Sequence, residues 1–175
     1  PWYRSVYEGA TPPRQEDGLL LRRLSLDLRG VVPTGEEVRE FLWDQQADRW
    51  SRWVDRFLHD PLHQQRMVEW WDVTLMERRP AQHVDRAAWI AWLREIVDRE
   101  YSIDRVMQEM LTAAWWEKDV RGPLRFFLDR NGDPHLITRD VARIFLGRDF
   151  QCNQCHDHPL IEDYLQEDYH GLLSY

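Results

Sequence analysis

The sequence predicts an all-α protein, an irregular bundle of several helices, on the strength of three observations. Apolar residues recur three and four positions apart through most of the 175 residues, which places them on one face of a helix. Residues that favour helix starts and helix ends stand at the borders of these segments. No stretch alternates apolar and polar residues in the manner of a half-buried strand.

The first predicted helix runs from Gly18 to Arg29, with Asp17 as its cap and Gly30 as its end. Residues 1–16 precede it as an irregular arm, because two adjacent prolines prevent helix formation there. We expect the rest of the chain to form a single helical domain, since its length suits one domain. No signal peptide is visible at the start, so we expect this domain to be excised from a longer protein.

A capping box of Thr34 and Glu37 predicts the start of a second helix, which runs to about Asp44. A third helix begins near Asp48. The apolar faces of these two helices are predicted to comprise Val38, Phe41, Leu42, Trp50, Trp53, Val54, Phe57 and Leu58.

Three more helices are predicted between Pro61 and Pro80, from about Asp85 to Glu100, and after a Ser102 cap. Many of the ten tryptophans fall on apolar faces, so we expect a tryptophan-rich core rather than an aromatic binding surface. The apolar faces of these helices hold Met67, Trp70, Trp71, Leu75, Trp89, Trp92, Leu93, Ile96, Val106, Met107 and Met110.

The last third of the chain begins with a turn at residues 131–134, marked by Asn-Gly-Asp-Pro. Thr138 is predicted to cap the next helix, which Gly147 ends, and a final helix follows Pro159. The segment between these last two helices contains both cysteines of the chain.

Those cysteines form the pattern Cys152-Asn153-Gln154-Cys155-His156, which is the spacing of covalent haem c attachment. Two thiols at this spacing bond to the two vinyl groups of one porphyrin, and the following histidine ligates the iron. The sequence therefore predicts haem c on Cys152 and Cys155, with His156 as proximal ligand. Haem c is attached outside the cytoplasm in bacteria, so this chemistry implies an exported, periplasmic protein.

Two other chemistries fit the same residues. The thiols could pair in a local disulfide, or Cys152, Cys155, His156 and His158 could hold a zinc or iron ion. For His158 itself three roles stay open besides a hydrogen bond to local backbone: contact with a haem propionate, orientation of the motif, or metal ligation.

The opposite face of a haem iron needs its own ligand, or stays open. His135 lies in the loop before the predicted helix and is our candidate for a distal ligand, although a lone loop histidine is more often solvated. Met107 and Met110 are expected to fill the core. A motif this close to the C-terminal end resembles the arrangement of cytochromes c′, whose iron is often open on one side.

The composition of the chain limits the classes of molecule that it is expected to bind. The net charge of −8 argues against nucleic acid and suits a basic redox partner. No apolar run is long enough to span a bilayer. No metalloprotease, phosphate-loop or serine-hydrolase motif is present.

A family resemblance is carried by several segments, namely 22–30, 33–34, 36–38, 54–58, 70–73, 141–147, 151–159 and 166–169. Together they resemble the planctomycete-type cytochrome-c-like domains, specifically the second such family. The closing segment around the cysteines is the most specific of them. The resemblance implies an exported bacterial domain of a larger multidomain protein, with a family name that presumes haem and no assigned reaction. His170 stands where that family often has an aromatic residue.

The leading hypothesis is a c-type cytochrome domain that binds one haem c and exchanges electrons with a partner protein or with neighbouring domains of the same parent chain. We expect an electron-transfer domain rather than a catalyst by itself. The alternatives are a non-haem module with a Cys/His metal site or a disulfide, and an open-site haem enzyme or sensor of peroxide or a diatomic gas.

Overall fold

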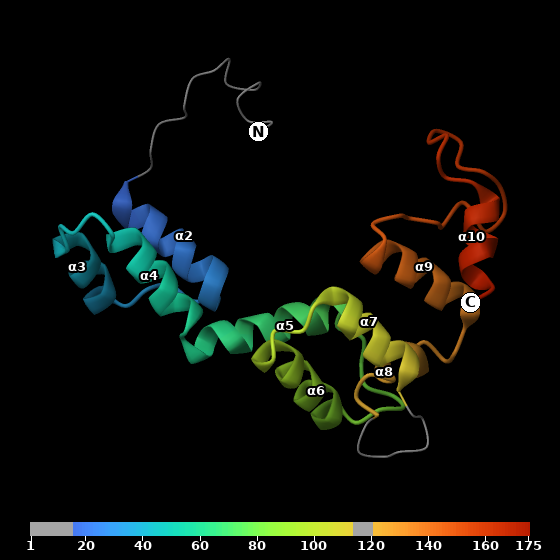
Figure 1. Ribbon diagram of the computed structural model, residues 1–175, viewed down its shortest axis with the longest axis horizontal. Coiled ribbons are helices and arrows are strands. Elements are labelled where there is room, and N and C mark those ends of the chain that lie inside the picture. Colours follow the sequence, from blue (N-terminus) through green and yellow to red (C-terminus); the bar gives the residue numbers. More distant parts are fainter. Residues whose placement is uncertain (1–15, 114–120) are drawn as a thin grey trace. The chain divides into compact units, whose positions relative to one another are not determined.

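The structure is a computed structural model that describes residues 16–113 and 121–175. Throughout these residues the regular elements are helices, and no strand occurs among them (Figure 1). This confirms the predicted all-α, multi-helix fold. The helices are α2 (Asp17–Arg29), α3 (Gly35–Trp43), α4 (Arg49–Leu58), α5 (Pro61–Met76), α6 (Arg86–Asp98), α7 (Ile103–Thr112), α8 (Arg125–Leu128), α9 (Pro134–Phe145) and α10 (Gln166–Leu173).

The chain divides into two compact units, residues 1–66 and 67–175. The single domain expected over residues 17–175 stays a prediction, and the N-terminal arm lies outside the described residues. None of the described helices combines the length and the apolar character needed to cross a membrane.

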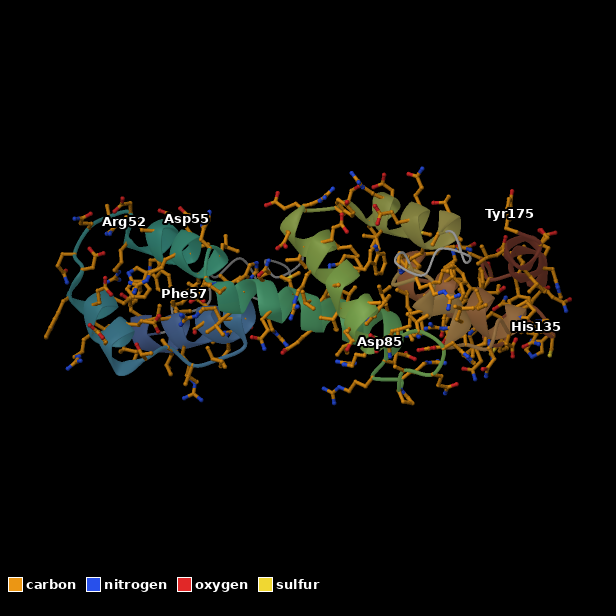
Figure 2. The ribbon with its side chains drawn as sticks, turned by 90° about the horizontal axis from the view of Figure 1, so that it is seen from below. Arg52, Asp55, Phe57, Asp85, His135 and Tyr175 are labelled. Atoms are coloured by element: carbon orange, nitrogen blue, oxygen red, sulfur yellow. The ribbon has the colours of Figure 1, made fainter. Side chains whose placement is uncertain are left out.

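In the first unit, α2, α3 and α4 enclose a small core of Leu21, Phe41, Trp53 and Phe57. Figure 2 labels Phe57 within this unit, where its side chain is fully buried. The predicted capping box is confirmed at the start of α3. The Thr34 hydroxyl accepts a hydrogen bond from the Glu37 amide at 3.1 Å, and the Glu37 carboxylate accepts one from the Thr34 amide at 2.7 Å.

A buried arginine ties the elements of this unit together. Arg29 is only 7% exposed, and its guanidinium lies 3.8 Å from the centre of the Phe57 ring. It donates hydrogen bonds to Glu37 at 2.8 Å and to Asp60 at 2.9 Å. The hydrogen bond from Arg29 lowers the pKa of Glu37, despite the opposing effect of burial.

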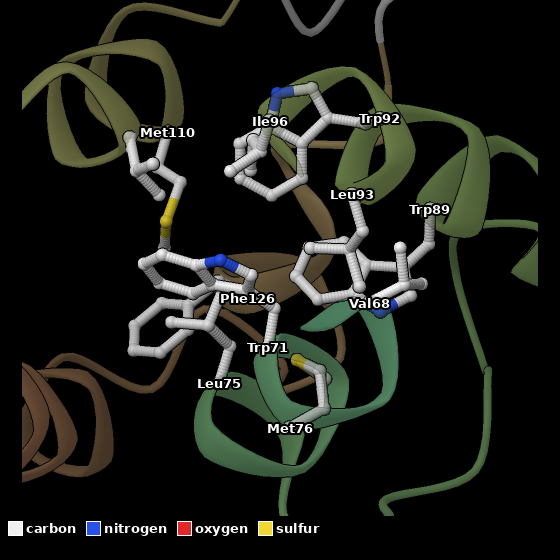
Figure 3. Close-up of a cluster of buried hydrophobic side chains, with 11 residues drawn as sticks. Val68, Trp71, Leu75, Met76, Trp89, Trp92, Leu93, Ile96, Met110 and Phe126 are labelled. Carbon is white, nitrogen blue, oxygen red and sulfur yellow. The ribbon is translucent and has the colours of Figure 1, made fainter. Parts of the chain in front are cut away.

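The second unit has a larger, tryptophan-rich core (Figure 3). It is formed by Val68, Trp71, Leu75, Met76, Trp89, Trp92, Leu93, Ile96, Val106, Met110 and Phe126. The helical spacing predicted most of these residues. Trp70 is an exception at 47% exposure, because it is next to Trp71 on α5 and adjacent residues point about 100° apart. Trp115 and Trp116 lie outside the described residues.

A second buried arginine connects α9 to this core. Arg130 is 1% exposed and donates to Asp140 at 2.6 Å, to the Phe126 carbonyl at 2.7 Å and to the Leu75 carbonyl at 2.9 Å. Since Asp140 belongs to α9, these bonds attach α9 to α5 and α8. The helix that precedes the cysteine motif is therefore anchored at a buried ion pair.

Three predicted helix starts were wrong. The N-cap of α2 is Glu16 rather than Asp17, which is the first helical residue. In α9, Asp133 is the cap: its carboxylate accepts from the amides of His135 and Leu136 at 2.9 and 3.1 Å, and a proline follows it. Thr138 consequently lies inside the helix, with its hydroxyl donating to a backbone carbonyl.

The third error concerns the last helix, which begins at Gln166 rather than just after Pro159. Residues 159–165 form turns, held by hydrogen bonds to the His158 ring and to the Tyr164 carbonyl. Local side-chain bonds here compete with the helix that the apolar spacing suggested.

Candidate functional site

The cysteine motif lies between α9 and α10, where the sequence placed it (Figure 1). It forms a tight turn in which the amides of Cys155 and His156 donate to the Cys152 carbonyl at 3.2 and 3.3 Å. Residues three and four apart in such a turn share a face. Cys152, Cys155 and His156 are accordingly all exposed, and both thiols are free rather than joined in a disulfide.

Asn153 points in the opposite direction and is fully buried. Its side-chain amide donates to the Tyr164 carbonyl at 2.5 Å, and its backbone amide donates to the Phe150 carbonyl at 3.1 Å. Its Oδ1 is buried and has no hydrogen-bond partner in the described part of the chain. Asn153 therefore anchors the inner side of the turn while the two cysteines face outward.

A small apolar cluster lies beneath this turn and is shared with both flanking helices. Ala142 of α9, Phe150 of the loop and Tyr169 of α10 are its buried members. The Phe150 ring meets Tyr164 and Tyr169 edge to face, with ring centres 5.9 and 6.5 Å apart. The motif is thus mounted on the packed pair of α9 and α10.

The His156 ring is held in one tautomer by its neighbour. Its Nδ1 lies 2.6 Å from the Asp157 carbonyl oxygen, and a carbonyl oxygen only accepts hydrogen bonds. Nδ1 must carry the proton, so Nε2 of the neutral ring holds a lone pair. A histidine with a donor bond at Nδ1 and a lone pair at Nε2 is in the form that ligates metals.

His158 has the reverse arrangement. Its Nδ1 accepts hydrogen bonds from the amides of Leu160 at 3.2 Å and Ile161 at 3.0 Å. Its own amide donates to the Tyr164 carbonyl at 2.9 Å. The hydrogen bond to local backbone, one of the roles left open for His158, is therefore present, and it occupies the lone pair of Nδ1.

His135 is not the loop residue that we expected, because α9 begins at Pro134. It lies in the first turn of this helix, which precedes the motif, and is exposed (Figure 2). Its Nδ1 is 2.7 Å from the Tyr169 hydroxyl, and the two rings are parallel within 2°. Burial raises the pKa of Tyr169; Arg139 opposes this rise, and the negative charges of Asp133 and Cys155 add to it. Tyr169 thus contacts His135 and, through the Phe150 ring, the loop that carries the motif.

The remaining methionines and histidines discussed as possible ligands, except for Met107, lie in the core or are hydrogen-bonded to backbone. Met110 is in the core of the second unit, as expected, but Met107 is only half-buried and lies outside that core. Met76 is also a core residue. His59 is the C-cap residue of α4, and His63 lies within α5. Each of these histidines has its Nδ1 within hydrogen-bond distance of a backbone carbonyl.

Asn153, Tyr164 and Tyr169 support the site but were not predicted to do so. Only their position inside or near the motif could have suggested a role, because neither a buried amide nor a backbone carbonyl leaves a signal in apolar periodicity. Throughout residues 16–113 and 121–175 no three His, Cys, Asp or Glu side chains are grouped as a metal site.

The helical fold and the position of the two cysteines define the chain as an all-α protein with an exposed Cys-x-x-Cys-His turn. Residues 7–175 match the PSCyt2 family, described as a protein of unknown function (DUF1549), and the chain belongs to this family. The family name suggests a cytochrome-like domain. No curated protein and no solved structure matches the chain.

Proposed function

We propose that this chain is an exported bacterial c-type cytochrome domain. It binds one haem c covalently through Cys152 and Cys155, with His156 as proximal iron ligand. It exchanges electrons with a partner protein or with neighbouring domains of its parent chain. The observation that carries the proposal is the shared outward face of these three side chains, together with a His156 tautomer suited to ligation.

The side chains of the Cys-x-x-Cys-His turn fit a covalently bound haem c. Both thiols are exposed and free to form thioether bonds, and His156 follows them with a lone pair on Nε2. A bound haem would supply one-electron chemistry at iron. The chain contributes the attachment points, the proximal ligand and, through Asn153, the support that orients the turn.

The test is an oxidised and a reduced absorption spectrum with denaturing mass spectrometry, on protein produced alongside the cytochrome c maturation machinery. We expect a Soret band that survives denaturation and a mass increased by one haem. A C152A/C155A double variant should be colourless at its unmodified mass. A colourless wild-type protein would overturn the proposal.

For the opposite face of the iron we propose His135, because its hydrogen-bond partner Tyr169 packs against Phe150, two residues before Cys152. Replacing His135 with Ala should convert a six-coordinate, low-spin spectrum to a five-coordinate, high-spin one. The matched control is His83→Ala, which alters a histidine hydrogen-bonded to Asn131. An unchanged low-spin spectrum in the His135 variant would exclude this ligand and leave the haem proposal standing.

The proximity of the two free thiols also favours a second candidate, a non-haem module that cycles between dithiol and disulfide. Thiol counting before and after mild oxidation separates it from the cytochrome. A loss of two reactive thiols in a colourless protein would support this candidate.

A further inference from the structure

The ring nitrogen Nδ1 has opposite hydrogen-bonding roles in His156 and in His158. The Nδ1 of His156 faces a carbonyl oxygen at 2.6 Å, so this nitrogen must donate. The Nδ1 of His158 receives two backbone amides at 3.2 and 3.0 Å, so this nitrogen must accept. A neutral imidazole carries one N–H, and the two rings are therefore held in opposite tautomers.

This difference determines what each ring offers at Nε2. His156 presents a lone pair, whereas His158 presents an N–H donor. In this arrangement neither nitrogen of His158 offers a lone pair to a metal, which separates it from the proposed iron ligand two residues earlier.

We propose that His158 donates its Nε2–H to a carboxylate of the group held by the motif, namely a propionate of the haem. This inference rests on the proposed haem. A donor bond to a carboxylate is charge-assisted and stronger than a neutral one. It would hold that propionate in place, a role that His156, which would bind the iron, does not fill.

The His158 ring is held firmly enough for this role. Besides the two bonds to Nδ1, its backbone amide donates to the Tyr164 carbonyl, which also accepts from the Asn153 side chain. The His158 ring meets the Tyr164 ring edge to face, with centres 5.8 Å apart. A fixed donor loses little conformational entropy on binding.

Two substitutions separate the roles of the two ring nitrogens. In His158→Asn, the side-chain oxygen takes the place of Nδ1 and accepts from the amides two and three residues on, as in an Asx turn before proline. This variant keeps the loop but has no group at Nε2. In His158→Gln, the longer amide brings an N–H donor to the position of Nε2, without the acceptor at Nδ1.

The first experiment uses the protein without haem, labelled with 15N-histidine. At neutral pH we expect His158 to show a protonated Nε2 and an unprotonated Nδ1, and His156 to show the reverse. A protonated Nδ1 on His158 would overturn the proposal. This readout does not depend on haem attachment.

The second experiment measures the equilibrium of the haem protein with a one-electron mediator. A carboxylate that loses its donor leaves more negative charge near the iron, which favours the ferric form. We expect His158→Asn to shift the equilibrium at least threefold toward the oxidised form, and His158→Gln to stay within twofold of wild type. His170→Asn, which alters an exposed histidine of α10, is the control and should change nothing.

An unshifted His158→Asn variant, or equal shifts in the Asn and Gln variants, would overturn the inference. A wild-type protein without haem would instead overturn the proposed function, while the tautomer measurement would still report on His158.

Discussion

At the scale of single residues, Gly122 shows how closely two segments of the second unit approach. A Cβ on this glycine would lie 2.8 Å from both the Ala88 carbonyl oxygen and the Trp92 Cβ. Both belong to α6, and real carbon atoms do not approach so closely. The glycine is required by packing, which no local sequence signal reveals.

We therefore expect Gly122→Ala to lower the free energy of unfolding by about 1–3 kcal/mol, the usual cost of overpacking. The matched control is Gly171→Ala in α10, where the added carbon would have no neighbour within 4 Å among the described residues, apart from the adjacent residues and the backbone of its own helix. Alanine there should stabilise by up to about 1 kcal/mol through helix propensity. Urea unfolding followed by tryptophan fluorescence measures both. Equal stability of the two variants would contradict the packing argument.

A second prediction at this scale concerns Glu37. Arg29 lowers the pKa of this carboxyl below its ordinary value of 4.5, so the folded state favours the ionised form. The resulting stability is fully present above pH 4.5 and is lost as the pH falls through the lowered pKa of the folded state.

Replacing Glu37 with Gln should cost about 1–3 kcal/mol at pH 7, because the buried Arg29 loses a charged partner. It should also flatten the fall in stability below pH 4.5. Glu36→Gln, a change at the exposed neighbouring residue, is the control and should do neither. The measurement is the urea midpoint at several pH values between about 3 and 7, a range that includes the ordinary carboxyl pKa of about 4. If stability depended on pH in the Glu37 variant as it does in the wild-type protein, this would count against the ion pair of Arg29 and Glu37.

At the scale of elements, the loop from Asp149 to Leu165 behaves as a folded unit rather than a connection. The Tyr164 carbonyl accepts from Asn153 and from the His158 amide, which joins the two ends of the loop. Arg148 lies over the Tyr164 ring, 5.3 Å from its centre. The position of the cysteines between two helices followed from the sequence, but the closure of the loop did not.

We expect Asn153→Ala to open this loop. Loss of one buried hydrogen bond should cost about 1 kcal/mol, and the His158 amide should exchange its hydrogen at least several-fold faster. Gln154→Ala, which changes the other residue between the cysteines, is the control. Hydrogen exchange followed residue by residue gives the answer. Equal protection of His158 in both variants would show that Asn153 is not the anchor.

At the scale of the whole molecule, the net charge of −8 acts on any redox partner. Acidic residues also flank the motif. They are Asp149, Asp157, Glu162, Asp163, Glu167 and Asp168. Attraction to a cation and repulsion of an anion should both weaken as salt screens these charges.

With haem attached, oxidation by the cation hexaammineruthenium should therefore slow as ionic strength rises, and oxidation by the anion ferricyanide should accelerate. Stopped-flow kinetics at several salt concentrations measure both rates, and each oxidant serves as the control for the other. Rates that change in the same direction for both oxidants would contradict electrostatic control by this chain.

The sequence by itself determined the helical class, the Thr34 and Glu37 capping box, the glycine that ends α2, and the position of the motif between two helices. These features depend on residues close together in the chain, where spacing is direct evidence of geometry. It also placed Cys152, Cys155 and His156 together, because a motif of five residues spans little more than one helical turn.

Only the tertiary structure decided how the motif is mounted and what its histidines offer. The buried Asn153, the pairing of His135 with Tyr169 and the ion pair of Arg130 with Asp140 join residues 10 to 34 positions apart. The opposite tautomers of His156 and His158 depend on which backbone groups the loop brings to each ring. Apolar periodicity tells which face of a helix is buried, but the partners of a polar group are set by how the chain folds back on itself.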